Sequence, residues 1–568
     1  MAERTGRFAI IEQFLADGMN YMFGNPGTVE QGFLDSLGSY PDFQYILALQ
    51  ESIAVGMADG YARATQRPTL VQLHSGVGLG NGIGMMYQAM RGHAPLVVIN
   101  GDAGVRYGAM DAQMAADLVN MAKPVTKWAA YASDSSSVLR LLRRAVKIAA
   151  TPPCGPVFLC LPMDVLDAPN NEPVVPTLIP STRVRPDSAD VERAAALLGR
   201  ARAPMIIIGD GVTSSGAQAE VTKVAELLGA DVWGADSSEV NIPASHPQFR
   251  GLLGHMFGHH SQPITHKADA VLIVGTYVFP EVFPALSDVF AAGTPVVHID
   301  LNAYEIGKNF NVDIGLVSDP KLTLADLATA LEQRMSTSEK DAAQARAAKI
   351  GGETRSEREA ARQGDVGRMD EVPMVPARFM RDLASRLPSD ALIFDEALTS
   401  SPDIIKYMPP DVVGQYFQTR GGSLGVGIPG ALGLKLANPS KTVIGFTGDG
   451  GSMYTIQALW TAAHHNIGAK FVICNNHSYK LLKLNVQQYW KDIALPEGEF
   501  PASFDLSHPD IRFDQMAESM GVPAVRVEHP NEVMPAIERA LADDNPFLID
   551  LVITGEVPGH PTVCVCGQ

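Results

Sequence analysis

The segment Thr442-Val-Ile-Gly-Phe-Thr-Gly-Asp-Gly450 decides the fold, together with Lys470-Phe-Val-Ile-Cys-Asn-Asn476 further along the chain. Each segment begins with a short apolar run that is typical of a buried strand. Asp449 and Asn476 therefore follow two strand ends, and a parallel sheet brings such ends to one edge. A carboxylate and an amide oxygen at that edge can meet at Mg²⁺, while the glycines let the main chain approach a diphosphate closely.

Short apolar runs alternate with helix-like stretches along all 568 residues. This rhythm predicts an α/β fold of three consecutive domains, each with a mainly parallel sheet flanked by helices. The clearest strand candidates are Thr69–His74, Leu96–Asn100, Val157–Leu161, Met205–Ile208, Ala270–Val274, Val296–Asp300, Ala391–Phe394 and Phe547–Val552. We expect domains at residues 1–168, 190–335 and 374–555, followed by a C-terminal tail at residues 556–568.

Two separators set these boundaries. The first, at residues 168–180, is rich in Pro and breaks both helices and strands. The second, Ser336–Glu371, is charged and rich in Ala, Gly and Arg, and it offers no apolar face to bury. We therefore expect two linkers between three domains of similar size.

The charge and the cysteine pattern exclude several classes of function. The formal net charge is −18, and no cluster of Lys and Arg marks a surface for nucleic acid. The N-terminus carries charges where a signal peptide needs an apolar stretch, and no later run has the length of a membrane span. The five cysteines show no CxxC spacing, which argues against a disulfide framework and a structural zinc site. We therefore expect a cytoplasmic protein without nucleic-acid or membrane partners.

The spacing between the Gly-Asp-Gly and Asn-Asn motifs is more specific than either motif alone. A second Gly-Asp-Gly, at residues 209–211, also follows a strand, but Ser237 stands where the second Asn is needed. We interpret that copy as a strand-to-loop turn. The complete pattern at Gly448–Asn476 resembles the thiamine-diphosphate-dependent decarboxylase and lyase superfamily, and the resemblance covers essentially the whole chain.

This resemblance implies pyrimidine-binding, central and diphosphate-binding domains in that order, with thiamine diphosphate and Mg²⁺ as cofactors. It implies a homodimer or homotetramer whose active sites lie between subunits. It implies that Asp449, Asn476 and the main-chain carbonyl of Ser478 hold Mg²⁺. Leu424 would be the apolar wedge that bends the cofactor, and the Gly422 carbonyl would accept a hydrogen bond from its aminopyrimidine. The other implied cofactor neighbours are Gly27, Glu396, Thr399, Gly448, Gly450, Ser452 and Tyr454.

The first domain contains the expected catalytic residues. Glu51 follows a strand and opens a helix, and the resemblance implies that it shares a proton with the pyrimidine ring. The N-terminal half is most similar to benzoylformate decarboxylase and its relatives, on Phe23-Gly-Asn-Pro-Gly-Thr28 and Leu73-His-Ser-Gly-Val-Gly-Leu-Gly-Asn81. This similarity implies that His74 donates or accepts a proton near neutral pH. It also implies that Thr28 and Gln113 lie beside the substrate.

Two departures from that group favour a different reaction. Val282 stands where the second catalytic histidine is expected, and valine cannot move a proton. The region after Asn476 is longer, and Glu497 or Glu499 within it is a candidate for the missing base. The tail could act as an active-site lid over a large thioester. We therefore expect a carbon–carbon lyase that cleaves a 2-hydroxyacyl-CoA to formyl-CoA and an aldehyde or ketone.

Several alternatives remain at this stage. The first is a benzoylformate-type 2-oxoacid decarboxylase, and the next is a carboligase similar to acetolactate synthase. A catalytically silent homologue is a further hypothesis, although Glu51 and Asp449 are both present. His255, His259 and His260 have a spacing that suits a helical metal site, but we favour a loop beside the substrate pocket. Cys564 and Cys566 are interpreted as part of an ordinary tail.

Overall fold

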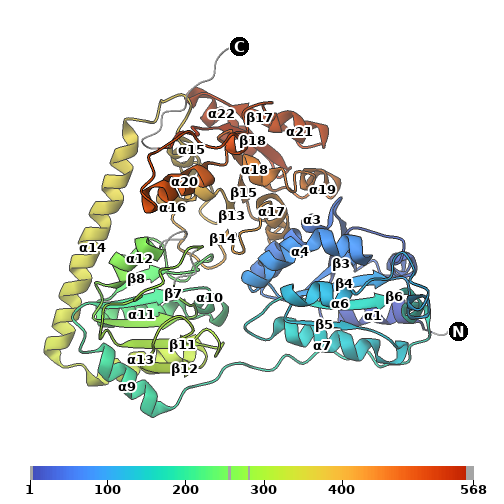
Figure 1. Cartoon of the computed structure of the whole chain (residues 1–568), viewed down its shortest axis with the longest axis horizontal. Coiled ribbons are helices and arrows are strands. Elements are labelled where there is room, and N and C mark those ends of the chain that lie inside the picture. The colour runs from blue at the N-terminus through green and yellow to red at the C-terminus, as the bar shows by residue number, and fades with distance from the viewer. Residues whose placement is uncertain (1–3, 254–257, 279–281, 558–568) are drawn as a thin grey trace.

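Three six-stranded parallel sheets form the framework of the chain, one in each of three domains (Figure 1). The computed structural model describes residues 4–253, 258–278 and 282–557. Helices flank each sheet, so the predicted α/β class with three successive domains is confirmed. The domain boundaries stay predictions, because the secondary structure continues through one of the two separators.

The first sheet has the strand order β2-β1-β3-β4-β6-β5. Its strands are β1 (Tyr21–Gly24), β2 (Gln44–Leu47), β3 (Thr69–His74), β4 (Leu96–Asp102), β5 (Trp128–Tyr131) and β6 (Val157–Pro162). The helices are α1 (Gly6–Ala16), α2 (Gln31–Ser36), α3 (Glu51–Thr65), α4 (Ser75–Arg91), α5 (Val105–Gly108), α6 (Leu118–Ala122), α7 (Val138–Ala150) and α8 (Met163–Asp167). β3 and β4 are buried almost throughout, which explains their continuous apolar sequence.

The central sheet has the order β12-β11-β10-β7-β8-β9. Its strands are β7 (Pro204–Ile208), β8 (Asp231–Gly234), β9 (Phe249–Leu252), β10 (Ala270–Val274), β11 (Val296–Asp300) and β12 (Ile314–Val317). The helices are α9 (Ser188–Leu198), α10 (Gly211–Ser215), α11 (Gln218–Leu228), α12 (Gly258–Thr265) and α13 (Pro320–Arg334). The predicted strands of this domain agree with β7, β10 and β11 within one residue.

The third sheet has the order β14-β13-β15-β16-β18-β17. Its strands are β13 (Leu392–Glu396), β14 (Tyr416–Gln418), β15 (Val443–Gly448), β16 (Lys470–Asn475), β17 (Ala524–Val527) and β18 (Phe547–Val552). The helices are α15 (Pro376–Ala384), α16 (Ser401–Tyr407), α17 (Gly427–Ala437), α18 (Asp449–Ser452), α19 (Ala458–His464), α20 (Lys480–Asp492), α21 (Phe513–Ser519) and α22 (Val533–Ala540). The two decisive sequence segments are therefore neighbouring strands, as their spacing predicts.

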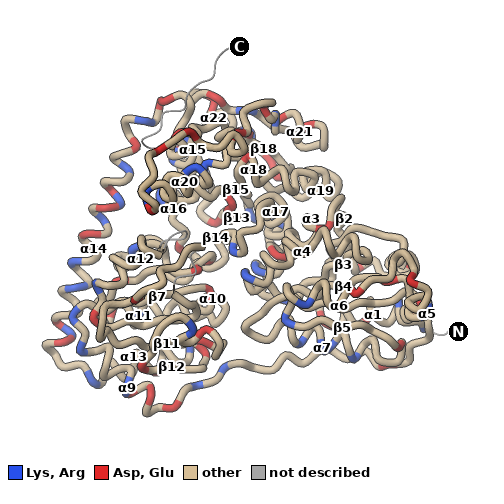
Figure 2. The backbone as a smooth tube through the Cα atoms, viewed as in Figure 1, with Lys and Arg blue, Asp and Glu red and all other residues tan. Residues whose placement is uncertain are grey.

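The second separator is a helix, α14 (Thr337–Val366), of 30 residues. It runs along one side of the molecule, from the central to the third domain, and carries charges of both signs (Figures 1 and 2). A capping box between Ser336 and Glu339 starts it, and Arg250 of the central domain contacts Glu353 and Glu357 on its face. The expectation that this segment has no apolar face to bury is wrong, because Ala343 and Ile350 are buried and Ala343 joins the core of the central domain. Good helix formers and these contacts together stabilise the helix.

The first and third domains pack through glycines. Helices α3 and α17 lie so close that a Cβ at Gly60 would overlap the Gly430 carbonyl, and one at Gly433 would overlap the Met57 carbonyl. One apolar core contains buried residues of both domains, including Met57 and Leu432. This packing holds the start of α3, with Glu51, at a set position relative to the third sheet.

Buried ion pairs join the three domains. Arg420, at the end of β14, binds Asp210 and Asp236 of the central domain, with a distance of 2.6 Å to Asp236. Arg63 of α3 binds Glu239 of the central domain at 3.2 Å. In the described part of the chain, no helix is both long and apolar enough to cross a membrane.

Candidate active site

The Gly-Asp-Gly and Asn-Asn strand ends meet at one edge of the third sheet. β15 pairs with β16, and Gly448 lies opposite Cys474. Asp449 opens α18, and its Oδ2 accepts a hydrogen bond from the Ser478 main-chain N–H at 3.0 Å. Asp449 is 4% exposed, and burial raises the pKa of its carboxyl. A buried carboxylate of this kind is stabilised in its ionised form by a nearby cation.

The other oxygen atoms at this edge also suit a cation. Asn476 Oδ1 is buried and has no hydrogen-bond partner among the described residues. The Ser478 carbonyl accepts from the Lys480 N–H at 2.8 Å and keeps a second lone pair. Within the described ranges, no group of three or more His, Cys, Asp and Glu residues could hold a metal. The fit therefore rests on a mixed set of oxygen donors, which Mg²⁺ accepts together with phosphate oxygens.

The second Gly-Asp-Gly has a different environment. The Asp210 carboxylate binds the Arg420 guanidinium, the Ser238 N–H at 2.9 Å and Asn241 Nδ2 at 2.8 Å. Both of its oxygen atoms accept hydrogen bonds, from Ser238 and Asn241 of the same domain and from Arg420 of the third domain. The predicted strand-to-loop turn is wrong in one respect, because Asp210 is followed directly by helix α10, which begins at Gly211. This copy of the motif has a role in domain packing through Arg420.

Glu396 holds the glycine-rich loop that carries Gly422 and Leu424. The carboxylate lies at the end of β13, 1% exposed, and accepts hydrogen bonds from the N–H groups of Gly425 and Gly427, at 2.6 Å for Gly427. Burial raises the pKa of this carboxyl to about 7. Gly422 and Gly425 have φ values of +72° and +95°, which side chains rarely adopt. Glu396 thus holds the main chain of the predicted cofactor loop through its hydrogen bonds to Gly425 and Gly427.

Glu51 is the first residue of α3 and is 7% exposed. Asn81 Nδ2 donates to Glu51 Oε2 at 3.0 Å, and a Cβ added at Gly78 would lie 2.8 Å from Oε1. That same Cβ position lies 3.2 Å from His74 Cβ, so Glu51 and His74 flank one glycine of α4. The structure therefore brings the two predicted catalytic residues of the first domain together.

His74 ends β3, and its Nδ1 lies 2.9 Å from Glu30 Oε2. Glu30 is 4% exposed, and its Oε1 accepts the Gly101 N–H at 3.0 Å. Burial raises the pKa of the Glu30 carboxyl, although His74 opposes this rise. Sequence reasoning missed Glu30, because a glutamate one residue before a helix is otherwise common on protein surfaces. Gly27 lies against His74, and a Cβ there would overlap the imidazole.

The remaining predicted residues differ in their exposure and contacts. Thr28 and Gln113 are exposed, so their contact with substrate stays a prediction. Gly450 lies against the Tyr479 ring, Ser452 is buried and donates to the Asp449 carbonyl at 2.8 Å, and Tyr454 is 57% exposed. Thr399 is half-buried in the turn after β13. These cofactor contacts also stay predictions.

The candidate replacements for the missing histidine lie near α20. Glu497 and Glu499 are exposed on the segment that follows it, and Val282 is 56% exposed. His259 Nε2, in the first turn of α12, lies 3.5 Å from Gln488 Nε2 of α20. The expected loop beside the pocket is therefore partly helical. His255, Cys564, Cys566 and the proposed lid from residue 558 onward lie outside the described residues.

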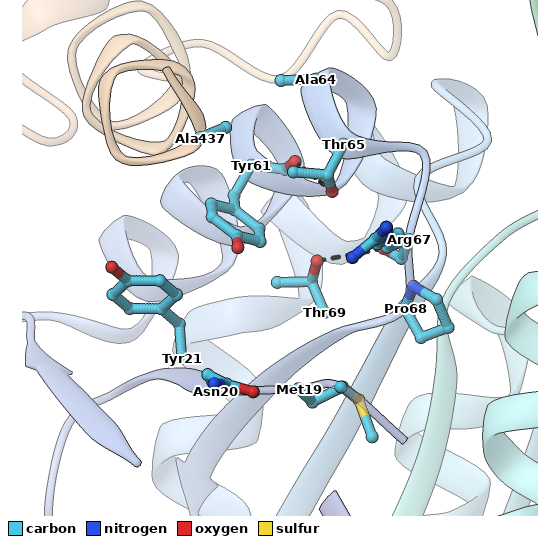
Figure 3. Close-up of a pocket in the computed structure, with 11 residues that line it drawn as sticks. Met19, Asn20, Tyr21, Tyr61, Ala64, Thr65, Arg67, Pro68, Thr69 and Ala437 are labelled. Atoms are coloured by element: carbon cyan, nitrogen blue, oxygen red, sulfur yellow. Dashed lines mark hydrogen bonds between the residues drawn. The ribbon is translucent and has the colours of Figure 1, made fainter. Parts of the chain in front are cut away.

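A cavity of about 270 Å³ lies at the opposite edge of the first sheet (Figure 3). Tyr61 points its hydroxyl into it, beside Tyr21 and Thr69, and Ala437 of α17 contributes to the wall. Thr69 begins β3 and His74 ends it, so about 17 Å of strand separates this cavity from the catalytic residues. The cavity is therefore distinct from the candidate active site.

Comparisons with known proteins agree with this site. Family models described as thiamine pyrophosphate enzyme match the chain at residues 4–121 for the N-terminal TPP binding domain, 191–327 for the central domain and 403–551 for the C-terminal TPP binding domain. The chain is 32% identical to benzoylformate decarboxylase of Pseudomonas aeruginosa over 552 residues, covering 96% of this chain and 98% of the relative. It is 27% identical to acetolactate synthase isozyme 3 large subunit of Escherichia coli, covering 98% and 96%.

A solved structure is similar over the same length. The thiamine diphosphate-dependent 4-hydroxybenzoylformate decarboxylase of Rhodococcus jostii RHA1 superposes with a TM-score of 0.83 at 27% identity, covering 97% of this chain and 99% of that one. The strand-end motif, the three matched domains and this full-length likeness lead to one assignment. The chain belongs to the thiamine pyrophosphate-dependent enzymes.

Proposed function

We propose that this chain is a 2-oxoacid decarboxylase that acts on benzoylformate or a similar aryl 2-oxoacid. The observation that carries the proposal is the pair of half-buried His74 and buried Glu30, one glycine away from Glu51. Such a pair supplies a histidine of defined tautomer beside the carboxylate that would face the cofactor. The relatives include two decarboxylases of aryl 2-oxoacids, which supports this substrate class.

The donors at the third sheet would hold Mg²⁺ and, through it, a diphosphate. Asp449, Asn476 and the Ser478 carbonyl would bind the ion, and Glu396 would keep the glycine-rich loop in place. When bound, thiamine diphosphate supplies the carbon nucleophile and the electron sink for loss of carbon dioxide. The family resemblance further implies that two copies of the chain form each site, so we propose at least a homodimer.

The side chains of the first domain would handle protons. Glu51 would hold a proton at its carboxylate toward the pyrimidine ring. His74 Nδ1 lies 2.9 Å from Glu30 Oε2, and we assign the Nδ1–H as the donor, which would leave Nε2 to exchange a proton with the substrate. Conversion of a 2-oxoacid carboxylate to an aldehyde and carbon dioxide takes up one proton, and His74 is the group we assign to deliver it.

A second acid or base would come from the central domain. Val282 has no ionisable group that could transfer a proton. His259 and His260 lie at the start of α12, where His259 approaches Gln488 of α20. The region after Asn476 is the part of the chain that we expect to line the substrate pocket. We therefore assign the missing histidine's task to His259 or His260, ahead of Glu497.

The 2-hydroxyacyl-CoA lyase that the sequence favours is not supported by the relatives named above, which are decarboxylases and an acetolactate synthase. An acyl-CoA substrate likewise has no support among them. The loss of one histidine and the longer segment after Asn476 were the basis of that preference. Both features are also compatible with a decarboxylase whose second proton-carrying group comes from α12.

The experiment is product analysis with purified protein, thiamine diphosphate and Mg²⁺, using benzoylformate, pyruvate and a short branched 2-hydroxyacyl-CoA in parallel. Benzaldehyde and carbon dioxide from benzoylformate, with one proton consumed per turnover, would support the proposal. Acetolactate from pyruvate alone, or formyl-CoA from the thioester alone, would refute it. Glu51→Gln protein is the control for background decarboxylation.

A further inference from the structure

The first turns of α4 hold the Glu51 carboxylate from two sides. Asn81 Nδ2 donates to Oε2 at 3.0 Å, and the Gly78 main chain lies against Oε1 so closely that a Cβ would be 2.8 Å away. Glu51 is buried, whereas Asn81 is exposed in the single chain. An exposed amide has water available, so its contact with a buried carboxylate indicates a defined position.

Asn81 is itself fixed by the residue that follows Glu51. Ser52 Oγ donates to the Asn81 carbonyl at 2.6 Å, and the Ser52 N–H donates to Gln50 Oε1 at 2.6 Å. The starts of α3 and α4 are thereby joined next to the carboxylate. This arrangement fixes the main chain from which the Glu51 and Asn81 side chains extend.

We propose that Asn81 is a positioning residue for the reaction, because its amide N–H holds one oxygen of Glu51 and leaves the carboxylate aligned toward the pyrimidine ring of the cofactor. This inference rests on the proposed function and on the role of Glu51 within it. Asn81 acts through Glu51 and needs no contact with substrate.

The electrostatic surroundings make a neutral donor useful here. The titratable groups that face Glu51 are Tyr45 of β2 and His74 of β3. Glu30 interacts electrostatically with both of them. Burial raises the pKa of the Tyr45 hydroxyl, which therefore stays neutral, and that hydroxyl donates to Gln72 Oε1 at 2.7 Å. An amide N–H favours the ionised carboxylate without adding a charge to this group.

The test compares Asn81→Asp, Asn81→Ala and Glu51→Gln with the parent enzyme, all loaded with thiamine diphosphate and Mg²⁺. Asn81→Asp keeps the shape, removes the donor and adds a negative charge, whereas Asn81→Ala removes the donor alone. Asn120→Ala is the matched control, since Asn120 is an exposed asparagine of the same domain whose Nδ2 donates to Asp117 at 2.7 Å. The measurements are the pH dependence of kcat/KM, the dissociation constant of thiamine diphosphate and the circular dichroism of its bound aminopyrimidine.

We expect both Asn81 variants to lose about 10- to 100-fold in kcat/KM, as for a hydrogen bond to a charged group. The acid limb of the pH profile and the dichroism transition should both move to higher pH, because the Glu51 carboxylate loses a donor. They should move further in Asn81→Asp, because its own carboxylate adds a negative charge beside Glu51. Cofactor affinity should change by less than about threefold. Asn120→Ala should match the parent enzyme.

An Asn81→Asp enzyme with the parent's pH profile and dichroism, alongside an inactive Glu51→Gln enzyme, would overturn the inference and leave the proposed function intact. Loss of cofactor binding without any shift of the profile would overturn it too, since that result indicates a structural role. A parent enzyme without decarboxylase activity that still binds cofactor would refute the proposed function. The dichroism transition would then decide about Asn81 by itself.

Discussion

The main-chain N–H of Ser478 donates a hydrogen bond of 3.0 Å to Asp449 Oδ2. This bond joins the two halves of the Gly-Asp-Gly and Asn-Asn motif across neighbouring strands β15 and β16. Next to it, Asn476 Oδ1 is buried without a hydrogen-bond partner among the described residues. The edge of the third sheet is thus assembled as a set of oxygen donors.

Removal of these donors should abolish stabilisation by the cofactor. We expect the parent protein to gain roughly 3 kcal/mol in unfolding free energy at Mg²⁺ and thiamine diphosphate concentrations about 100 times the dissociation constant. Asp449→Asn and Asn476→Ala should gain almost none, because the ion loses a ligand. Thermal unfolding with and without EDTA measures this. Asn545→Ala, an exposed asparagine of the same domain, is the control, and equal stabilisation of all variants would contradict the metal assignment.

The pH dependence of stability should report on Glu396. Burial raises the pKa of this acid in the folded chain to about 7, so the folded state binds the proton more tightly than the unfolded state. Its contribution to stability is therefore full below the unfolded value, near pH 4.5, and is lost as pH rises to about 7. Relative to Glu396→Gln, the parent should lose up to roughly 3 kcal/mol across this window.

Denaturant unfolding of both proteins at pH 5, 6, 7 and 8 checks this loss. Glu538→Gln, at an exposed position of the same domain, provides the control and should follow the parent at every pH. A stability difference between the parent and Glu396→Gln that does not vary with pH would refute the assignment.

The His74–Glu30 pair should be needed for turnover and dispensable for folding. We expect His74→Ala to lower kcat about 100- to 1,000-fold with benzoylformate, the range of a lost general acid or base. Glu30→Gln should lower kcat about 10-fold, since it no longer holds the imidazole tautomer. Steady-state kinetics and thermal unfolding test this, with the exposed Asp42→Asn as control. Normal kcat in Glu30→Gln would show that the pair has no catalytic part.

Substitution of a central-domain histidine should lower kcat, whereas substitution of Val282 should not. If His259 or His260 carries the second proton, one of His259→Ala and His260→Ala should lower kcat at least about 100-fold. Val282→Ala should change it less than about threefold, because this side chain is exposed and has no proton to transfer. Single-turnover kinetics locate the affected step. Full activity in both histidine variants would transfer the assignment to Glu497, with Glu497→Gln as the deciding variant.

A larger residue in the glycine contact between α3 and α17 should lower the stability of the chain. A Cβ at Gly60 would overlap the Gly430 carbonyl, so Gly60→Ala should destabilise the chain by about 1–3 kcal/mol or more. Gly352 lies within α14 with nothing near its Cβ position, so Gly352→Ala should stabilise by about 0.5–1 kcal/mol. Chemical denaturation compares the two. Equal effects would mean that the helices can separate without cost.

The sequence by itself determined ten of the eighteen strands in the described residues and the strand-end motif. Buried parallel strands leave continuous apolar runs, so β3, β10 and β18 agree with their predictions residue for residue. The Asp449 and Asn476 pair was readable because its spacing follows from two neighbouring strands. This motif extends only from the end of β15 to the end of β16, so the pattern of neighbouring residues is sufficient to predict it.

Only the tertiary structure decided which polar groups face one another across long separations. Glu30 became the partner of His74 because β3 ends beside the turn before α2, a contact that no local pattern encodes. Asp210 and Asp449 share the same three-residue motif, yet Arg420 fills the surroundings of the first and leaves the second available. The charged stretch of α14 became a helix because contacts with the central domain stabilise it. Burial and pairing, which set these outcomes, depend on the folded whole.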